Sequence, residues 1–467
     1  MKRKFSGKFV LGVSVLSLLL GSALTFAFVA LKLLSSSSAP LNSVTEAYQN
    51  IMQNYYQPVK SQQLVNGAIQ GMLDTLDDPY SQLLTSQNQT DFDESISGKI
   101  SGIGATIEQN GDQIQIVSAM PHSPAAKAGL KARDQIQKIN QHSTKKMTVR
   151  KASQLTRGKQ GTKVVLTIKR QDRTFTKTLR RAPIQVATVH GELTKQNSQV
   201  GQVTITQFSE KTATELKREI QKLQRKGARK LVIDVRNNPG GVMDQAIAAA
   251  SLFVPNGKAI MTITDRAGEQ KTYRAAAKYL GGTKIKLPTV VLVDGGSASA
   301  AEIFAAALHE SAQIPLVGEK TYGKGVVQTV NSLGAKSEMK ITTAKWLTPK
   351  KHWINHRGIE PTDLVKYPAY MNLTAFKSQK TLTAGANDAD IQRAQKVLKA
   401  LDYSLSVTGT LDATTVQVLR DFQSKQKITV NGKLDLATRQ ALTQALVKKA
   451  QAQDPMLQKA QEILTAK

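Results

Sequence analysis

Three glycine-rich segments carry residues that could together perform acyl transfer. They are LVIDVRNNPGG (231–241), VVLVDGGSASAAEIF (290–304) and EKTYGKGVVQ (319–328). The second segment places Ser297 and Ser299 where a strand is predicted to run into a helix, and a serine there can present its hydroxyl to a substrate carbonyl. Serine is also a common helix cap, so the segment alone leaves a purely structural role open.

The first segment could supply an oxyanion hole. Paired glycines at 240 and 241 follow a predicted buried strand and precede a helix. Glycines let backbone N–H groups approach a ligand closely, and a helix N-terminus favours negative charge. An ordinary strand–helix turn is the alternative interpretation of this segment.

Lys324 is the candidate general base, and its chemistry makes a demand on its surroundings. A free lysine has a pKa of about 10.4, so it accepts a proton at neutral pH only where its charged form is disfavoured. Gly323 and Gly325 flank Lys324 and remove neighbouring side chains, while Tyr322 and residues 326–327 are apolar. Burial among such residues would lower the pKa of the amine and suit it to proton transfer.

Other catalytic chemistries find little support. The chain has no cysteine, which excludes disulfides and thiol catalysis. No G-x-S-x-G motif is present, and His309 lies ten residues beyond Ser299 in an alanine-rich stretch. His352 and His356 are four positions apart but lack the H-E-x-x-H pattern. We therefore expect neither a metal site nor a cofactor.

Taken together, these motifs resemble the C-terminal processing peptidases, a family of Ser–Lys proteases. The order NNPGG, GSASA-x-E-I and Y-G-K-G-x-x-Q carries the resemblance, and LDDPYS, KITTAKWLTPK and GIEPTD add to it. In that family the nucleophile and the base are 25 residues apart, which selects Ser299 over Ser297 as the partner of Lys324. The resemblance also implies that Gln328 orients Lys324.

The same resemblance implies an oxyanion hole formed by the amides of Gly240 and Ala300. It covers most of residues 44–367 and implies a serine endopeptidase.

The elements that must position these residues form an α/β core. Between residues 184 and 371, strand-like runs such as KLVIDVR and TVVLVDG alternate with helical runs such as ASAAEIFAAAL. Such alternation predicts parallel strands covered by helices.

Residues 95–183 instead show short strands with glycine turns and resemble a PDZ domain, a β-sandwich or barrel. Gly102, Ile103 and Gly104 would form its carboxylate-binding loop, where a protein C-terminus adds as an edge strand. Arg157 matches a position that couples substrate sensing to activation in some family members.

The C-terminal part predicts a small three-helix module. Residues 372–387 form a linker, and residues 388–447 contain the motif G-x-L-D-x-x-T twice, with each Asp placed to cap a helix. This module resembles a peptidoglycan-binding domain, so cell-wall glycan is an expected partner. Residues 448–467 form a helix that we expect to pack on the protein or on a second copy, which leaves a homo-oligomer open.

The N-terminus predicts a membrane anchor over residues 1–34, followed by a stalk and helical segment over residues 35–94. Phe9 to Leu31 contains no charged residue, and as a helix it would span roughly 34 Å, enough for a hydrocarbon core. Basic residues precede this run, so the positive-inside bias places the body outside the cytoplasm. A cleaved signal peptide is the alternative, and it also leaves the body exported.

The formal net charge of +30 suits anionic wall polymers or lipids. Aromatic residues make up 5% of the chain and form no stripe with basic residues, so nucleic acid is not an expected partner.

The sequence thus predicts a multidomain α/β protein that acts as an exported, membrane-anchored serine endopeptidase. Its substrates would be proteins with free C-termini, recognised through the PDZ domain. The alternative is a catalytically inactive adaptor that gathers proteins at the wall.

Overall fold

The computed structural model describes most of the chain. The described residues are 12, 17, 18, 21, 22, 25, 39–334, 337–368, 370, 373, 376, 378 and 380–466. Most of the predicted anchor, residues 1–34, and part of the predicted linker therefore lie outside the described residues. Within the described part of the chain, no helix has the length and apolar character needed to cross a bilayer.

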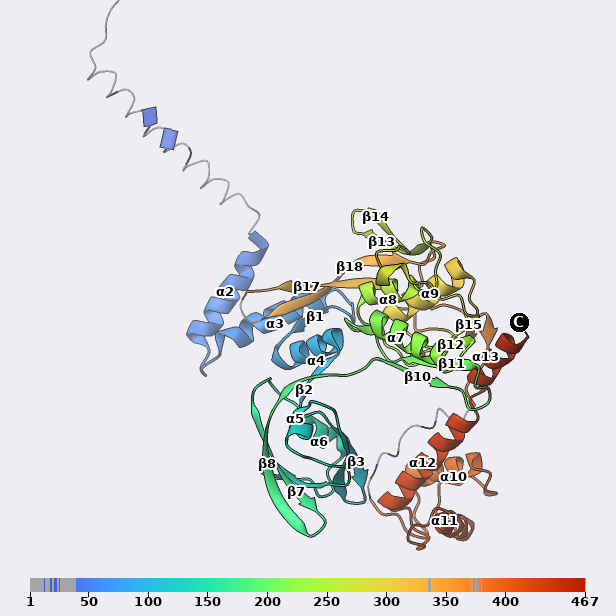
Figure 1. The fold of residues 1–467 in the computed structure, drawn as a ribbon. Coiled ribbons are helices and arrows are strands. Elements are labelled where there is room, and N and C mark those ends of the chain that lie inside the picture. The colour runs from blue at the N-terminus through green and yellow to red at the C-terminus, as the bar shows by residue number, and fades with distance from the viewer. Residues whose placement is uncertain are drawn as a thin grey trace, which may run out of the picture. The chain divides into compact units, whose positions relative to one another are not determined.

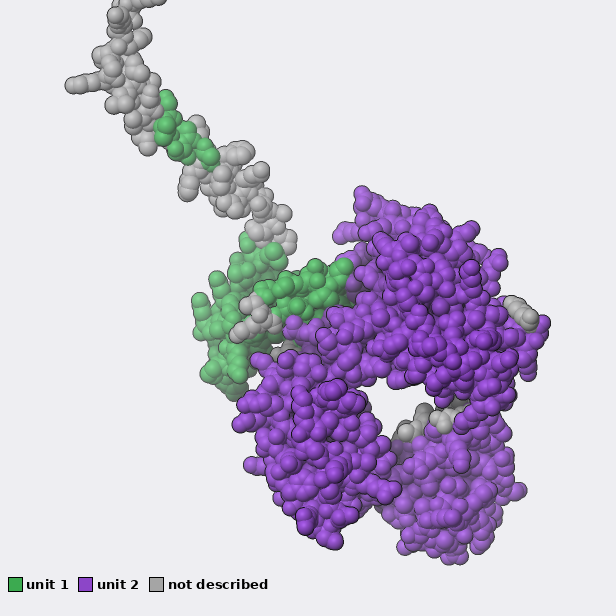
Figure 2. All heavy atoms as spheres, in the orientation of Figure 1, with its two compact units in different colours: residues 1–85, 329–342 green, residues 86–328, 343–467 purple. Residues whose placement is uncertain are grey.

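The chain divides into two compact units, which are coloured separately in Figure 2. The first unit comprises residues 1–85 and 329–342, and the second comprises residues 86–328 and 343–467.

Over its residues 39–85, the first unit contains helices α2 (Ala39–Asn54) and α3 (Ser61–Asp74) and the strand β1 (Gln82–Leu84). A turn at Asp78 follows α3, because its carboxylate accepts hydrogen bonds from the Tyr80 N–H and the Ser81 hydroxyl. The chain then enters β1, which pairs antiparallel with the first residues of β18 (Glu338–Leu347). The segment predicted to be helical is thus interrupted by a strand, since the leucines of β1 are buried in a sheet.

The second unit begins with helix α4 (Ser86–Ser97) and a six-stranded sheet. Its strands are β3 (Ala105–Asn110), β4 (Gln113–Ala119), β5 (Gln135–Ile139), β6 (His142–Ser143), β7 (Lys163–Arg170) and β8 (Arg173–Arg180). Helices α5 (Pro124–Lys127) and α6 (Val149–Thr156) accompany this sheet. In β7 the side chains of Val164, Leu166 and Ile168 are fully buried, which is the alternation expected of a strand with one face on the core.

The chain enters and leaves this sheet side by side. Strand β2 (Lys99–Gly102) pairs antiparallel with β9 (Ala182–Gln185). This two-stranded ribbon joins the β-rich region to the α/β region that follows.

The α/β region is built on a second six-stranded sheet. In spatial order its strands are β10 (Val189–Leu193), β11 (Val200–Ile205), β12 (Lys230–Asp234), β15 (Thr289–Val293), β16 (Leu316–Gly318) and β19 (Asp363–Leu364). The strands from β11 to β19 pair parallel, and β10 pairs antiparallel at the edge. Strands β12 and β15 are almost wholly buried, as expected for parallel strands covered on both faces. The predicted α/β core is confirmed.

Helices cover both faces of this sheet (Figure 1). One face packs on α7 (Thr212–Arg225), α8 (Met243–Ala250) and α9 (Ala300–Ala312), which share one apolar core with Ile233 and Val291. The other face, with Val232 and Leu292, packs on α13 (Pro455–Thr465), the last helix of the chain. Of the two expected arrangements of the C-terminal helix, the structure shows packing on the protein itself, with the helix beginning at Pro455 and not at residue 448 because the preceding helix runs to Ala452.

A smaller antiparallel group continues the α/β region. Strands β13 (Ala259–Asp265) and β14 (Gln270–Arg274) form a hairpin, and β13 also pairs with the last residues of β18. Strand β17 (Val326–Ser332) precedes β18 in the chain and pairs with it.

Three helices form the C-terminal module: α10 (Ala389–Ala400), α11 (Ala413–Lys425) and α12 (Leu436–Ala452). The two predicted caps are present. Asp412 accepts a hydrogen bond from the Thr415 N–H at the start of α11, and Asp435 accepts one from the Thr438 N–H at the start of α12.

A buried glutamine organises each copy of the repeat. Gln395 accepts a hydrogen bond from the Gly409 N–H and donates one to the Thr415 hydroxyl. Gln423 accepts one from the Gly432 N–H in the second copy. The two glycine turns are therefore tied to the preceding helix in the same way.

Candidate active site

Two neighbouring strands bring the first two glycine-rich segments together. Strands β12 and β15 are adjacent and parallel, so their carboxyl ends lie at the same edge of the sheet. The turn of residues 236–241 follows β12, and the turn of residues 294–299 follows β15. The backbone joins the two turns directly, because the Ala298 N–H donates to the Asn238 carbonyl at 2.9 Å.

Gly240 lies against Ser299 so closely that no side chain would fit. A Cβ atom at Gly240 would meet the Ser299 Cβ at 2.8 Å and the Ala300 nitrogen at 2.9 Å. Gly240 also has a φ of 102°, in the region that only glycine adopts readily. The structure thus places Gly240 beside both the candidate nucleophile and the Ala300 nitrogen.

Ser299 itself has a strained backbone. Its φ of 54° and ψ of −113° are unusual for a residue with a side chain. It directly precedes α9, so Ala300 is the first residue of the helix, where backbone N–H groups have no partner within the helix. Ser297, the other candidate serine, is fully buried and donates its hydroxyl to the Val235 carbonyl. This bond gives Ser297 a structural role.

Glu302 connects the candidate nucleophile to the candidate base. One of its carboxylate oxygens accepts hydrogen bonds from both the Ser299 N–H (2.8 Å) and the Lys324 N–H (2.9 Å). The other accepts from the Gly323 N–H (2.7 Å) and the Thr321 hydroxyl (2.6 Å). The backbones of Ser299 and Lys324 are thereby held on a single oxygen atom.

Glu302 is fully buried, and its environment has two opposed effects on its charge. Burial raises the pKa of Glu302 above its ordinary value, and the hydrogen bonds donated by Thr321, Lys324, Gly323 and Ser299 offset part of that rise. Glu302 was not assigned a role from the sequence. The signal that could have found it is the capping-box spacing, since Glu302 is three residues after Ser299 at the start of a helix.

The glycines beside Lys324 serve close backbone packing. A Cβ atom at Gly323 would meet the Gly358 nitrogen at 2.7 Å, and one at Gly325 would meet the Asn355 nitrogen at 2.6 Å. The sequence suggested that these glycines keep side chains away from Lys324. The structure adds that they let the base loop, residues 321–325, lie against residues 354–358.

Both tryptophans of the chain bind this loop. The indole N–H of Trp346 donates to the Lys324 carbonyl at 2.8 Å, and that of Trp353 donates to the Gly325 carbonyl at 2.9 Å. Trp346 is buried (1% exposed), whereas Trp353 is 46% exposed. Successive carbonyls of the base loop are thus fixed by two rings of very different exposure.

The surroundings of Lys324 are less enclosed than the sequence suggested. Lys324, Val326 and Val327 are half-buried, and Tyr322 is 57% exposed. Tyr322 lies at the surface although its N–H donates to the Ser297 carbonyl beneath it. Gln328, which is also half-buried, is the third residue of β17.

The Gly240 amide, expected to face an oxyanion, has a partner in this conformation. It donates a hydrogen bond of 2.9 Å to the side-chain oxygen of Asn238, which is fully buried. Asn238 in turn donates to the Ile205 carbonyl at 2.8 Å. An oxyanion role for this amide therefore requires that it turn away from Asn238. The sequence did not indicate this competing acceptor.

The expected carboxylate-binding loop lies at the end of β2 and the start of β3. Ile103 is buried in the core of the β-rich region, and its carbonyl accepts from the Ala125 N–H. The Gly104 carbonyl accepts from the Met120 N–H and from the Ser123 hydroxyl. These bonds fix the loop.

Arg157, at the end of α6, lies beside helix α4. Its guanidinium is 3.8 Å from one carboxylate oxygen of Glu94, whose other oxygen accepts from the Ser101 N–H at 2.9 Å. A cavity of about 940 Å³ is lined by Glu94, Arg157 and Gln207, among others. Glu94 thus links Arg157 to the residue that precedes the Gly102–Gly104 loop. The sequence did not single out Glu94.

Comparisons with known proteins agree with this architecture. Four family models match the chain: the activating protease CtpB N-terminal domain at residues 30–88, a PDZ domain at 115–170, peptidase family S41 at 199–365, and a peptidoglycan binding domain at 387–442. The predicted PDZ and peptidoglycan-binding-like modules are thereby confirmed. The match at residues 30–88 had no counterpart in the sequence analysis beyond a helical segment.

Several relatives match about nine tenths of the chain. The carboxy-terminal processing protease CtpA of Bacillus subtilis (strain 168) is 42% identical over 431 residues, which are 92% of this chain and 91% of that protein. A protein of Staphylococcus saprophyticus named "Probable CtpA-like serine protease" is 37% identical over 418 residues, covering 89% of this chain and 84% of its own. Among solved structures, the photosystem II D1 C-terminal processing protease is 26% identical, with a TM-score of 0.42, covering 69% of this chain and 92% of its own.

Proposed function

The chain belongs to peptidase family S41, among the carboxy-terminal processing serine proteases, and we propose that Ser299 is its nucleophile and Lys324 its general base. The observation that carries this proposal is the shared carboxylate of Glu302. Its Oε2 atom accepts the N–H of both residues, which keeps the two ends of the proposed dyad together.

The proposed reaction proceeds through an acyl-enzyme. Lys324, in its neutral form, takes the proton of the Ser299 hydroxyl as the oxygen attacks the scissile carbonyl. The ammonium of Lys324 then returns that proton to the leaving amine, and Ser299 is left as an ester. Water hydrolyses the ester, with Lys324 again as the base. No cofactor takes part.

The oxyanion is stabilised in this proposal by backbone amides. The Ala300 amide is at the start of α9, where the helix dipole favours negative charge. The Gly240 amide becomes the second donor to the oxyanion when its hydrogen bond to the side chain of Asn238 breaks. Gln328, four positions after Lys324 on β17, orients the amine.

Substrates in this proposal are proteins with free C-termini. The PDZ region receives the terminal carboxylate at Gly102, Ile103 and Gly104, and the chain is then cut near that end. Arg157, beside Glu94, couples occupancy of the PDZ region to the protease core.

The proposed location is the outer side of a cell membrane. Support comes from the uncharged run of residues 9–31, which follows four basic residues, and from the high net positive charge. The C-terminal module would bring the enzyme to wall glycan, and a homo-oligomer is compatible with this arrangement.

Peptide cleavage by the full chain and by matched variants tests the proposal. We expect Ser299→Ala and Lys324→Ala to lose at least about a thousandfold in kcat, as removal of a nucleophile or its base does in serine proteases. Lys320→Ala is the matched lysine control, because Lys320 is a surface residue paired with Glu360. It should cleave at the wild-type rate.

The alternative function, a catalytically inactive adaptor, makes the opposite prediction. An adaptor would bind peptides with free C-termini but show the same negligible cleavage in wild type and Ser299→Ala. Equal residual activity in both proteins, across peptides that bind, would replace the protease proposal with the adaptor.

A further inference from the structure

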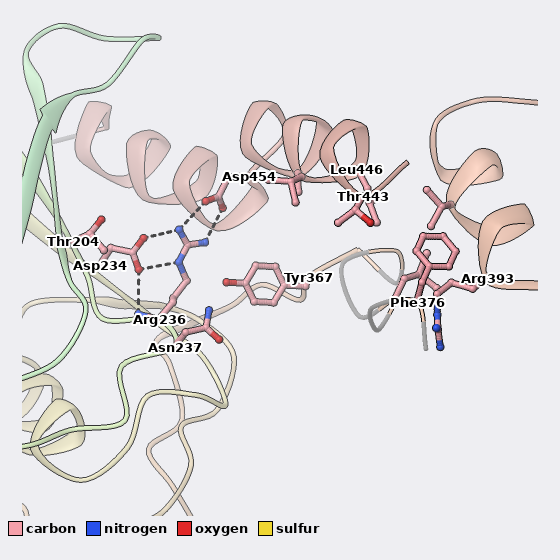
Figure 3. A pocket seen from close by; sticks show the side chains of 14 residues that line it. Thr204, Asp234, Arg236, Asn237, Tyr367, Phe376, Arg393, Thr443, Leu446 and Asp454 are labelled. Carbon is pink, nitrogen blue, oxygen red and sulfur yellow. Dashed lines mark hydrogen bonds and ion pairs between the residues drawn. The ribbon is translucent and has the colours of Figure 1, made fainter. Parts of the chain in front are cut away.

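Arg236 is the first residue of the turn of residues 236–241, here called the Gly240 turn. Its guanidinium is held between two carboxylates (Figure 3). Asp234 accepts from its Nε at 2.9 Å and from its Nη2 at 2.6 Å. Asp454 accepts from its Nη1 at 3.0 Å and from its Nη2 at 2.7 Å. Because a guanidinium is a rigid planar fork, two bidentate partners fix both its position and its plane.

This cluster is enclosed. The side chains of Arg236, Asp234 and Asp454 are 10%, 7% and 15% exposed. Burial opposes the charge of Arg236, but the two carboxylates outweigh it and raise the pKa of the guanidinium. The Tyr367 ring lies 5.9 Å from the guanidinium carbon, and the cluster borders a cavity of about 540 Å³. Because these three side chains are largely buried, solvent screens the attraction between Arg236 and the two carboxylates only weakly.

Asp454 is itself held rigidly. It is the N-cap of α13, where its Oδ1 also accepts from the N–H groups of Met456 and Leu457. Helix α13 buries Met456, Ala460 and Leu464 against strands of the parallel sheet. The docking of α13 on the sheet thus fixes the position of Asp454 next to Arg236, although the two residues are more than two hundred positions apart in the chain.

The turn that begins at Arg236 leads directly to the proposed nucleophile. The Asn237 N–H donates to Asp294 at 2.8 Å, and Asn238 is fully buried. Gly240 then lies against Ser299, where a Cβ would be 2.8 Å from the Ser299 Cβ. A shift of Arg236 would reach Gly240 and Ser299, because only three residues separate Arg236 from Gly240 and the Asn238 carbonyl is bonded to the Ala298 N–H beside Ser299.

We propose that Asp454 is a positioning residue for the peptidase site: it fixes Arg236 and, through it, the Gly240 turn beside Ser299. The inference rests on the proposed Ser–Lys function. Asp454 lies outside the segments that match family models, which end at residue 442. The N-cap of the last helix therefore serves the peptidase site, while the helix itself covers the sheet.

Asp454→Asn is a mild way to disturb this contact. The substitution keeps the size of the side chain and one acceptor oxygen, but it turns an amide N–H₂ toward the guanidinium. Arg236 keeps Asp234 as a partner, so no buried charge is left unpaired. The fold should persist while the plane of the guanidinium shifts.

The matched control lies on the same helix. Lys459 approaches Asp363 at 3.8 Å and Glu462 at 4.0 Å, and its side chain is 40% exposed. Lys459→Gln removes a contact between α13 and the sheet without touching the Gly240 turn. It separates loss of helix docking from loss of the Arg236 contact.

The experiment measures peptide cleavage, labelling of the nucleophile by a fluorophosphonate, and hydrogen exchange of the full chain. We expect Asp454→Asn to lower kcat and the labelling rate roughly tenfold or more, as small misplacements of reacting groups do, with KM unchanged. Amides of residues 236–241 should exchange faster than in wild type. Lys459→Gln should match wild type in kcat, in labelling rate and in hydrogen exchange. Asp454→Glu, which keeps the carboxylate, should have a smaller loss of kcat than Asp454→Asn.

Two results would overturn the role of Asp454. One is wild-type kcat and wild-type exchange of residues 236–241 in Asp454→Asn. The other is an Asp454→Asn preparation in which one fraction of the enzyme takes up no label and the labelled fraction has the wild-type kcat. That result would mean that the substitution only unfolds part of the protein. Ser299→Ala with wild-type cleavage would instead overturn the proposed dyad, and the exchange of residues 236–241 would still decide the role of Asp454.

Discussion

The two halves of the proposed dyad are positioned in different ways. Ser299 lies between a buried parallel strand and a buried helix, with Gly240 packed against it. Lys324 lies on a loop between two strands, and the side chains of Glu302, Trp346 and Trp353 hold the backbone of that loop. The nucleophile is therefore placed by the junction of a strand and a helix, whereas the base loop is placed by side-chain hydrogen bonds and by its backbone packing on residues 354–358.

This difference indicates where the enzyme can change shape. Displacing Ser299 would disturb a close-packed core, while displacing Lys324 would break a small number of polar contacts near a half-exposed surface. Apart from the turn of the Gly240 amide away from Asn238, adjustment of the site should therefore occur mainly on the side of the base.

Among changes to the residues that hold the proposed dyad, Glu302→Gln should have the largest effect, because Glu302 accepts from the backbone of both halves. A glutamine can keep only one oxygen, so two of the four donors lose their acceptor. We expect kcat to fall by about a hundredfold or more and the free energy of unfolding to fall by about 2–6 kcal/mol, at about 1–3 kcal/mol for each of the two buried unsatisfied groups.

Steady-state cleavage and chemical denaturation check this prediction. Glu310→Gln is the matched control, since Glu310 lies on the same helix and accepts from the Lys350 N–H away from the dyad. Equal kcat for the two variants would show that Glu302 does not join the dyad.

Gly240→Ala should break the nucleophile side. Its Cβ would press on Ser299 and on the backbone of Ala298, and its φ of 102° would be strained. We expect kcat to fall about a hundredfold, as for a misplacement of about 1 Å, with a loss of about 1–3 kcal/mol in stability.

Gly257→Ala provides the comparison for this strain. Gly257 also has a positive φ, but a Cβ there would meet nothing within 4 Å. The Gly257→Ala variant should be less stable than wild type and should have the wild-type kcat. If Gly240→Ala cleaves peptides as well as Gly257→Ala, the packing of Gly240 on Ser299 has no catalytic importance.

Trp353→Phe should have a smaller effect, confined to the base side. It removes the N–H that donates to the Gly325 carbonyl and keeps an aromatic ring. Because Trp353 is half-exposed, water can replace its N–H as the donor to the Gly325 carbonyl. We expect the transition state to lose about 1 kcal/mol of stabilisation, which is roughly a fivefold fall in kcat.

Trp346→Phe extends this comparison to the buried ring. The Lys324 carbonyl would lose its donor where water has little access, so a larger loss of stability is expected than for Trp353→Phe. Thermal unfolding and kcat of both variants check the order. The reverse order would contradict the view that exposure decides how firmly each ring holds the loop.

The sequence predicted the architecture well where patterns are local. Residues 95–183 were predicted to form short strands, the apolar runs before Gly240 and Gly295 predicted parallel strands, and the aspartates of the repeat predicted caps. The short strand β1 was missed because its pairing partner lies far along the chain.

The candidate site was predictable only in part, for a related reason. The motifs selected Ser299 and Lys324 as reacting groups, but the contacts that hold them depend on tertiary packing. Trp346 and Trp353 reach the base loop from later in the chain, and Asp454 reaches Arg236 from the last helix. Spacing along the chain carries no signal for such contacts.

The most direct test of the account is the site of covalent labelling. A fluorophosphonate, followed by digestion and mass spectrometry, should modify Ser299 in wild type and should label it far more slowly in Lys324→Ala. Labelling of another residue, or an unchanged rate at Ser299 without the Lys324 amine, would contradict the proposed dyad.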